Sequence, residues 1–326
     1  MSSPHAASPG MPPGHLAMAL VVVAVWGTNF VVIHEGLAEF SPLTLGALRI
    51  FFASVPLLPF LPWPDVRPLT VVSYGLLSGA LQFGLMLYAM NGHISPGLAS
   101  TLLQMQALFT AVIAALAGSE RLDRRDVLGL VISGLGIAVI GGHVADGDAS
   151  ILGIACVLGA ALAWACANII VRRARPTRAI SLVAWSNLFA IPPLVAATLL
   201  VDGPGRVLGS IVHASFGGWM VVLWQSLANA LFGYSVWNWL LARHPASRIA
   251  PLALLVPAFG LGASAWYLSE PLQAWKIIAA LAIVGGLFLG MTRPRQFRRP
   301  LPGLLGTGLT DHSQKSTLAA SSSAEN

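Results

Sequence analysis

Ten long apolar stretches run through this chain, and each comes near the length that crosses a lipid bilayer as one helix. The hydrocarbon core of a bilayer is about 30 Å thick, which corresponds to about 20 helical residues. The expected spans are residues 16–34, 41–61, 69–90, 96–118, 126–142, 151–171, 179–200, 216–241, 247–268 and 274–292. Charged residues make up only 9% of the chain, against about 25% in soluble proteins. The sequence therefore predicts an all-α integral membrane protein with ten transmembrane helices.

Basic residues fall almost entirely on one side of this predicted arrangement. With the N-terminus inside, the inward loops and the tail carry Arg67, Arg121, Arg124, Arg125, Arg172, Arg173, Arg175, Arg178, Arg243, Arg248, Arg293, Arg295, Arg298, Arg299 and Lys315. The outward loops carry only Arg206 and Lys276. Loops rich in Lys and Arg stay in the cytoplasm, so both termini are expected there. No face interleaves basic and aromatic residues, so the net charge of +6 is better explained by cytoplasmic loops than by nucleic-acid binding. We expect membrane lipid, and no nucleic acid, among the partners.

A pattern in the first half of the chain recurs in the second half at a distance of 150 residues. Residues 96–100 open an apolar run that ends at 119–122, and residues 246–250 open one that ends at 269–272. Each half holds five spans, an odd number, so the second half must enter the membrane from the opposite face. Two inverted repeats of this kind are a common build of secondary transporters. The predicted units are a disordered tail (1–15), a first repeat (16–142), a second repeat (151–292) and a basic, then disordered, cytoplasmic tail (293–326).

A polar amide lies near the same depth in the first span of each predicted repeat. Trp26 and Asn29 belong to the first span, and Trp164 and Asn168 belong to the sixth. An unpaired amide that faces lipid is costly, which favours a shared cavity between the repeats, lined by these residues. The alternative is that the amides only form hydrogen bonds between helices.

Arg49 is the one charge well inside a predicted span. An arginine at the bilayer centre costs about 2.5–3.5 kcal/mol on insertion scales, so it should face water or a partner. Its guanidinium group could hold a substrate carboxylate through two parallel hydrogen bonds. It could equally be a structural anchor that bonds backbone carbonyls or extends outward.

The fourth and eighth spans carry further amides. In an ideal α-helix, Gln104 shares a face with Ser100, whereas Gln106 points nearly opposite. We therefore expect Gln104 to line the cavity and Gln106 to serve packing. Gln225, Asn229 and Gly233 form a stripe at a spacing of four residues, and we expect the Gly-x-x-x-Gly pairs 75/79 and 286/290 to be helix contacts.

Signatures of coupling and catalysis are sparse. No Asp or Glu lies in the middle of a predicted span, so proton coupling remains open, with only His34, Glu35, His93, Glu120 and Glu270 as peripheral candidates. The sequence shows no phosphate-binding Gly-Lys loop, no His or Cys cluster at metal spacing, and no nucleophile–base pattern. We expect no cofactor, no bound metal and no enzymatic activity.

The chain resembles the EamA-type members of the drug/metabolite transporter superfamily over about residues 16–292. The motifs that carry the resemblance are WGTNFVVI (26–33), GLAS (97–100), WACAN (164–168), RIAPL (248–252) and the paired Ser-Glu turns. The resemblance implies a ten-helix carrier of the bacterial inner membrane that exports small hydrophilic metabolites, among them amino acids of the cysteine pathway. It also implies functional positions at Trp26, Asn29, Arg49 and Gln104. The family pattern has a lysine where this chain has His34, which puts a substrate-attracting charge there in doubt.

The sequence thus predicts an alternating-access exporter of a small zwitterionic metabolite. Arg49 is expected to bind the carboxylate, and Asn29, Gln104 and Asn168 to line the path. A multidrug carrier is the alternative within transport. A carboxylate in the middle of a span would favour cationic drugs, and the absence of one from the predicted spans argues against this alternative. A receptor or scaffold that moves nothing is the alternative from another class, and the sequence leaves a homodimer open.

Overall fold

The structure is a computed structural model that describes residues 11–118, 122–244 and 246–291. Residues 1–10 of the predicted N-terminal tail, all of the predicted C-terminal tail, and Glu120 lie outside the described residues. The described residues form helices joined by turns and loops, with one isolated bridge between Ile94 and Ala149, so the predicted all-α class is confirmed. The first helix begins at Pro13, three residues before the expected span, because proline favours the first helical turn.

The elements follow in chain order, with η for 3-10 helices and for the two π-helices η2 and η5. They are α1 (Pro13–Leu37), α2 (Pro42–Ser54), η1 (Val55–Phe60), α3 (Pro68–Tyr74), η2 (Gly75–Leu81), α4 (Gln82–Met90), α5 (Pro96–Leu102), η3 (Leu103–Met105), α6 (Gln106–Leu116), α7 (Arg124–Gly142), η4 (Val144–Asp146), α8 (Ile151–Ala174), α9 (Ala179–Val201), α10 (Pro204–Val212), α11 (Phe216–Leu223), η5 (Trp224–Phe232), α12 (Gly233–Arg243), α13 (Ala246–Ile249), η6 (Ala250–Leu255), α14 (Val256–Tyr267) and α15 (Ala274–Met291).

Seven helical stretches among the described residues are long and apolar enough to cross a membrane. They are Pro13–Leu37, Pro42–Phe60, Pro68–Met90, Pro96–Leu116, Arg124–Gly142, Ile151–Ala174 and Ala179–Val201. An eighth is reached if Pro204–Val212 and Phe216–Trp237, which meet at a bend of 98°, count as one span. Pro251–Tyr267 and Ala274–Gly290 are shorter apolar helices that coincide with the last two expected spans. The protein is therefore a membrane protein with multiple apolar helices.

Helix starts follow from local capping chemistry. Ser41, Ser150 and Ser215 precede α2, α8 and α11, and each side chain accepts a hydrogen bond from a backbone N–H of the first turn. Asp123 and Asp126 form a reciprocal capping box at the start of α7. These caps satisfy backbone donors that would otherwise be exposed at the helix ends.

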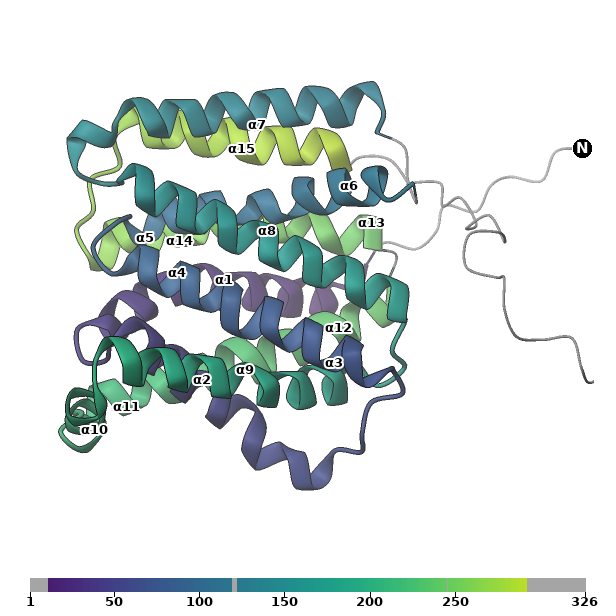
Figure 1. The fold of residues 1–326 in the computed structure, drawn as a ribbon. Coiled ribbons are helices and arrows are strands. Elements are labelled where there is room, and N and C mark those ends of the chain that lie inside the picture. The colour runs from purple at the N-terminus through teal and green to yellow at the C-terminus, as the bar shows by residue number, and fades with distance from the viewer. Residues whose placement is uncertain (1–10, 119–121, 245, 292–326) are drawn as a thin grey trace, which may run out of the picture.

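The helices lie roughly parallel and pack in pairs (Figure 1). α7 and α15 lie side by side at one edge, α2 packs against α9, and α1, α4, α5, α8 and α14 fill the middle. Both predicted glycine contacts are confirmed: a Cβ on Gly75 would clash with the Ser186 carbonyl, and one on Gly286 would clash with the Gly129 carbonyl. Glycine thus lets the backbones of α9 and α7 approach their neighbours closely.

The helical irregularities recur at the spacing of the sequence repeat. Shifted by 150 residues, the π-helix η2 falls inside η5, and the 3-10 helix η3 falls inside η6. π-Turns are rare and often occur at functional sites. The same departures from α-helix therefore occur at matching places in the two halves of the chain.

Two carboxylates clamp loops of the first half to loops of the second. Glu39 accepts hydrogen bonds from the backbone N–H (2.8 Å) and the hydroxyl of Ser215. Asp65 accepts them from the backbone N–H (3.1 Å) and the hydroxyl of Thr177. These bonds stabilise the ionised carboxylates, so they hold the pKa of Glu39 and of Asp65 below its ordinary value.

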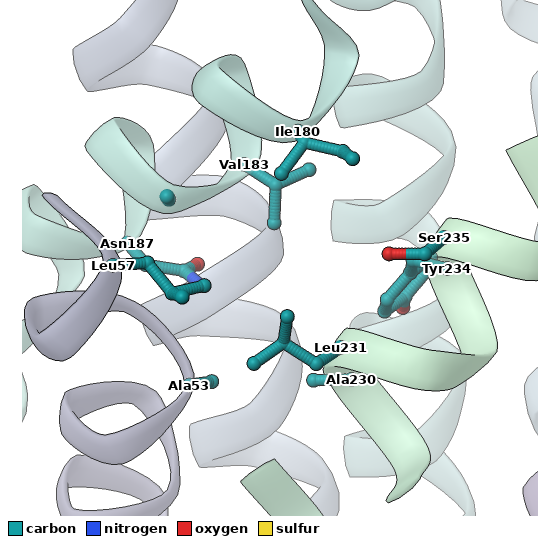
Figure 2. Close-up of a pocket in the computed structure, with 10 residues that line it drawn as sticks. Ala53, Leu57, Ile180, Val183, Asn187, Ala230, Leu231, Tyr234 and Ser235 are labelled. Atoms are coloured by element: carbon teal, nitrogen blue, oxygen red, sulfur yellow. The ribbon is translucent and has the colours of Figure 1, made fainter. Parts of the chain in front are cut away.

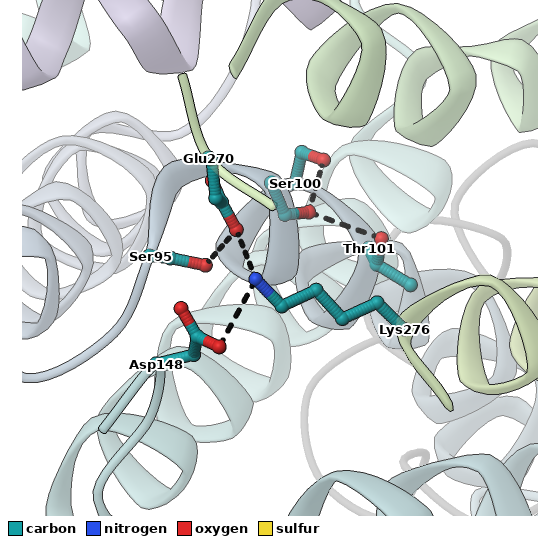
Figure 3. Close-up of polar contacts among 7 residues, drawn as sticks. Ser95, Ser100, Thr101, Asp148, Glu270 and Lys276 are labelled. Carbon is teal, nitrogen blue, oxygen red and sulfur yellow. Dashed lines mark hydrogen bonds and ion pairs between the residues drawn. The ribbon is translucent and has the colours of Figure 1, made fainter. Parts of the chain in front are cut away.

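A buried ion cluster ties three loops together where α5, α8 and α15 begin (Figure 3). The Lys276 ammonium group lies 3.0 Å from Glu270 and 3.1 Å from Asp148, and its side chain is fully buried. The Ser95 hydroxyl donates a hydrogen bond of 2.6 Å to Glu270. The sequence assigned Lys276 to an outward loop, but it lies in the first turn of α15, where two carboxylates compensate its charge. We name this end of the molecule the Lys276 end.

Candidate functional site

A cavity of about 590 Å³ lies between the helices of the two halves. Its wall contains five of the six residues singled out from the sequence, namely Trp26, Asn29, Gln104, Trp164 and Asn168. Their elements are α1, η3 and α8, which pack near one another in the middle of the bundle. The predicted grouping of these side chains around one cavity therefore matches their positions in the structure.

Arg49 does not line this cavity but a small chamber next to it. The chamber has a volume of about 40 Å³, which is room for a few atoms. Its wall shares Tyr74, Gln82, Phe83 and other residues with the main cavity. Arg49 therefore lies behind the wall of the main cavity rather than in it.

The Arg49 guanidinium group is only partly satisfied by the protein. Its Nη2 donates a hydrogen bond of 3.0 Å to the Asn229 side-chain oxygen, and its carbon lies 3.5 Å from the centroid of the Phe83 ring. The side chain is 3% exposed, and its Nε and Nη1 have no hydrogen-bond partner in the part of the chain that the structure describes. Two buried donors without partners are costly, so this site favours an anionic group that would accept from them.

Asn229 joins Arg49 to the main cavity. Its side-chain oxygen accepts from Arg49, while its backbone carbonyl accepts a hydrogen bond of 3.2 Å from the Trp26 indole N–H. Trp26 also contacts the rings of Tyr234 and Trp237, at centroid distances of 5.5 and 5.1 Å. Asn229 lies in the π-helix η5 and lines the main cavity. Its stripe with Gln225 and Gly233 was visible in the sequence, but it did not single out Asn229 as a site residue.

The polar residues of the fourth span differ from the sequence prediction. Gln104 lines the cavity as expected, and its amide N–H donates a hydrogen bond of 3.4 Å to the Ala253 carbonyl. Gln106 lines the cavity as well, so the prediction that it only packs was wrong. The 3-10 segment η3 changes the rotation between the two residues, because it has three residues per turn rather than 3.6. Gln106 accepts a hydrogen bond of 2.9 Å from Asn168.

The cavity wall is neutral apart from one cation. Among its described lining residues Arg172 is the only charged side chain, and no Asp or Glu occurs. The peripheral candidates His34, Glu35, His93 and Glu270 do not line it. No group of three or more His, Cys, Asp or Glu in the described ranges could hold a metal ion. The wall is suited to hold a polar solute by hydrogen bonds rather than by paired charges.

The cavity reaches towards one end of the bundle. Its wall includes Arg172, Pro176 and Ala179, which lie at or beside the connection between α8 and α9, and we name this the Arg172 end. The described loop residues of the Lys276 end do not contribute to the wall. The ion cluster of Figure 3 thus lies at the end that the cavity does not reach.

A third, smaller pocket lies on the side of α9. Figure 2 shows its mostly apolar wall, with Leu57, Ile180, Val183 and Leu231 around it and the polar groups of Asn187 and Tyr234 at its rim. Its volume of about 40 Å³ is too small for a metabolite. It shares Val183 and Tyr234 with the main cavity.

Comparison with known proteins gives a family and relatives. Residues 14–142 and 151–292 each match the model of the EamA-like transporter family. A probable amino-acid metabolite efflux pump of Escherichia coli (strain K12) is 35% identical over 285 residues, which cover 84% of this chain and 93% of the relative. A pump of the same description from Salmonella typhimurium is 34% identical, with the same coverage. One crystal structure is similar in fold, with a TM-score of 0.60, 17% identity, and coverage of 85% of this chain and 95% of the other.

Proposed function

Because the chain belongs to the EamA-like transporter family, we propose that it is a secondary carrier that exports a small amino acid or a related metabolite across the bacterial inner membrane. The family and its relatives are transporters, not enzymes. The single observation that carries the substrate class is Arg49, a buried arginine with two unpartnered donor nitrogens beside a cavity of about 590 Å³. A zwitterion offers the carboxylate that these donors lack.

The proposed architecture is ten spans arranged as two inverted five-helix repeats, 16–142 and 151–292. The two family matches and the recurrence of η2 and η3 in η5 and η6 support it. The two carboxylate clamps are consistent with it as well. Glu39 and Thr177 each follow the first helix of their repeat, α1 and α8 respectively. Their partners, Ser215 and Asp65, each precede the third span of the other repeat. Inverted repeats would put one clamp on each face of the membrane.

The proposed orientation places the Arg172 end in the cytoplasm. The described basic residues at that end are Arg67, Arg124, Arg125, Arg172, Arg173, Arg175, Arg178, Arg243 and Arg248. Arg206 and Lys276 lie at the other end. Under the positive-inside rule the cavity then faces the cytoplasm, which is the loading state of an exporter. Alternating access would open the Lys276 end by breaking the cluster of Lys276, Asp148 and Glu270.

In the proposed binding mode the substrate carboxylate enters the chamber of Arg49 and accepts from Nε and Nη1. Asn229 holds the guanidinium group in place from the other side. Asn29, Gln104, Asn168 and the rings of Trp26 and Trp164 form the wall around the rest of the molecule. Lysine at position 49 would keep the charge but lose the planar fork that binds a carboxylate through two bonds.

Counterflow in proteoliposomes tests the proposal. Vesicles loaded with an unlabelled amino acid, first one with a small polar side chain, should accumulate the labelled form, and Arg49→Gln should abolish this. Arg206→Gln, which removes an exposed arginine at the Lys276 end, is the matched control and should leave counterflow unchanged. Arg49→Gln protein that is folded and transports like wild type would overturn the binding mode.

The same assay separates the rival functions. A multidrug or other metabolite carrier would exchange cationic dyes or non-amino-acid metabolites but no amino acid. A receptor or scaffold would show binding without any flux. Counterflow repeated with and without a pH gradient reveals whether protons are coupled to transport, for which the cavity wall offers no carboxylate.

A further inference from the structure

Gln106 and Asn168 form an amide pair on the cavity wall, joined between α6 and α8. The Asn168 side-chain N–H donates to the Gln106 side-chain oxygen at 2.9 Å and makes a longer contact of 3.4 Å with the Thr110 hydroxyl. Thr110 in turn donates to the Gln106 backbone carbonyl at 2.7 Å. All three residues line the main cavity and are half-buried. The cluster is thus held in place by the protein and also faces the open space.

The pair leaves one donor nitrogen, with both of its N–H groups, and one acceptor oxygen free. An amide has two N–H groups and an oxygen, and the single bond between the two side chains uses the oxygen of Gln106 and one N–H of Asn168. Among the described residues, the Gln106 Nε2 and the Asn168 oxygen have no hydrogen-bond partner. If both amides were turned over, the Gln106 oxygen and the Asn168 Nδ2 would be free instead. Either orientation presents one donor beside one acceptor.

This arrangement fits a neutral group better than a charged one. A hydroxyl or a primary amide donates and accepts at once, so it can satisfy both free positions. A carboxylate would face the free acceptor oxygen, and an ammonium group would face the free N–H donor. Among the described lining residues of the cavity, no carboxylate is present to hold a cationic side chain. The chemistry of the pair therefore selects uncharged, hydrogen-bonding side chains.

We propose that Gln106 and Asn168 form a specificity subsite for the side chain of the transported amino acid, and that this side chain carries a hydroxyl or a primary amide. The inference rests on the proposed function, in which Arg49 takes the carboxylate of the same molecule. The alternative is a purely structural role, in which the pair only connects α6 to α8. Removal of the two amides would then change stability but not substrate choice.

The experiment compares substrates that differ by the group in question. Serine and alanine, and glutamine and leucine, compete for counterflow of a labelled amino acid in wild-type proteoliposomes. Two hydrogen bonds between neutral groups correspond to about a tenfold preference, so serine should compete about tenfold better than alanine. In Gln106→Met/Asn168→Leu, which removes both amides at similar volume, this ratio should fall to about one.

The matched control is Gln225→Met, the same change at a buried amide outside the cavity wall, and it should keep the wild-type ratio. Gln106→Glu keeps an oxygen for Asn168 and loses the free N–H. It should weaken O-methylserine, which can only accept at its side chain, more than serine. An unchanged serine-to-alanine ratio in the double variant, or equal competition by both amino acids in wild type, overturns the subsite. Wild-type vesicles that exchange no amino acid overturn the proposed function itself.

Discussion

Lys276 should contribute more to stability than any exposed basic residue of this chain. Its ammonium group is fully buried and is shared by Glu270 and Asp148, at 3.0 and 3.1 Å. Lys276→Met keeps the length and apolar stem of the side chain but leaves two carboxylates without their cation. Breaking a buried ion pair by removing one partner costs about 3–5 kcal/mol.

The exposure of the two carboxylates indicates which of them accounts for most of this loss of stability. Asp148 is 18% exposed and regains some hydration, whereas Glu270 is 8% exposed and has one oxygen with no hydrogen-bond partner among the described residues. Most of the loss should therefore come from Glu270. Replacing both groups together, in Lys276→Met/Glu270→Gln, removes the more buried of the two stranded charges and should recover about half or more of the lost free energy, because neutral replacement of a buried pair is often tolerated.

Reversible unfolding in mixed micelles, followed by tryptophan fluorescence, measures these free energies. Arg206→Met is the control: this exposed residue should change the free energy of unfolding by about 0.5 kcal/mol or less. The reasoning is refuted if Lys276→Met costs under about 1 kcal/mol, the usual worth of an exposed pair. It is equally refuted if the double variant is no more stable than Lys276→Met.

Three further predictions concern other parts of the molecule. Asn229→Ala should raise the substrate concentration for half-maximal counterflow about tenfold, since it frees Arg49 from its one side-chain hydrogen-bond partner, while Asn91→Ala in an exposed loop should not. Gly75→Ala should destabilise the protein by about 1–3 kcal/mol in the same unfolding assay, because its Cβ meets the Ser186 carbonyl, whereas Gly134→Ala, with open space around it, should be neutral or stabilising. The lowered pKa of Glu39 means that its contribution to stability is complete above its ordinary pKa of 4.5 and is lost as the pH falls through the folded-state value. Glu39→Gln should flatten that acid limb of the stability profile, and a limb that stays unchanged would show that the clamp contributes nothing.

The apolar stretches and the cavity residues could be predicted from the sequence, because the cost of placing polar groups in lipid acts on each residue by itself. A polar side chain inside a 20-residue apolar stretch must find water or a partner, so Trp26, Asn29 and Asn168 could be assigned to a common cavity. The same rule indicated that Arg49 needs water or a partner. It could not indicate which groups surround Arg49, because Phe83 and Asn229 come from distant segments of the chain. The sequence put Lys276 at the start of a predicted span but did not show its ion pairs, because position along the chain does not tell which carboxylates pack against it.

Gln106 and Asn229 were missed because the prediction assumed ideal helices. Two steps along an α-helix rotate by about 200°, so Gln104 and Gln106 would point about 160° apart. Two steps along a 3-10 helix rotate by about 240°, which brings their directions to about 120° apart. The turn at η3 thus brings both amides to the cavity. Asn229 lies in a π-helix, where each residue turns by less than in an α-helix. Single-residue propensities give little sign of either irregularity.

These irregular segments also explain how a cavity can form at membrane depth. Non-α backbone is tolerated there only where the protein or water satisfies its polar groups. The carbonyls of Asn229 in η5 and Ala253 in η6 accept from Trp26 and Gln104 respectively, so the freed backbone groups become anchors for the cavity side chains. The irregularities match between the halves at 150 residues, but their side chains do not: Gln104 corresponds to Leu254, and Asn229 to Gly79. Under the proposed function, a backbone frame that repeats, with polar groups on only one copy at each place, would give the substrate one defined orientation while leaving the two repeats able to move in similar ways.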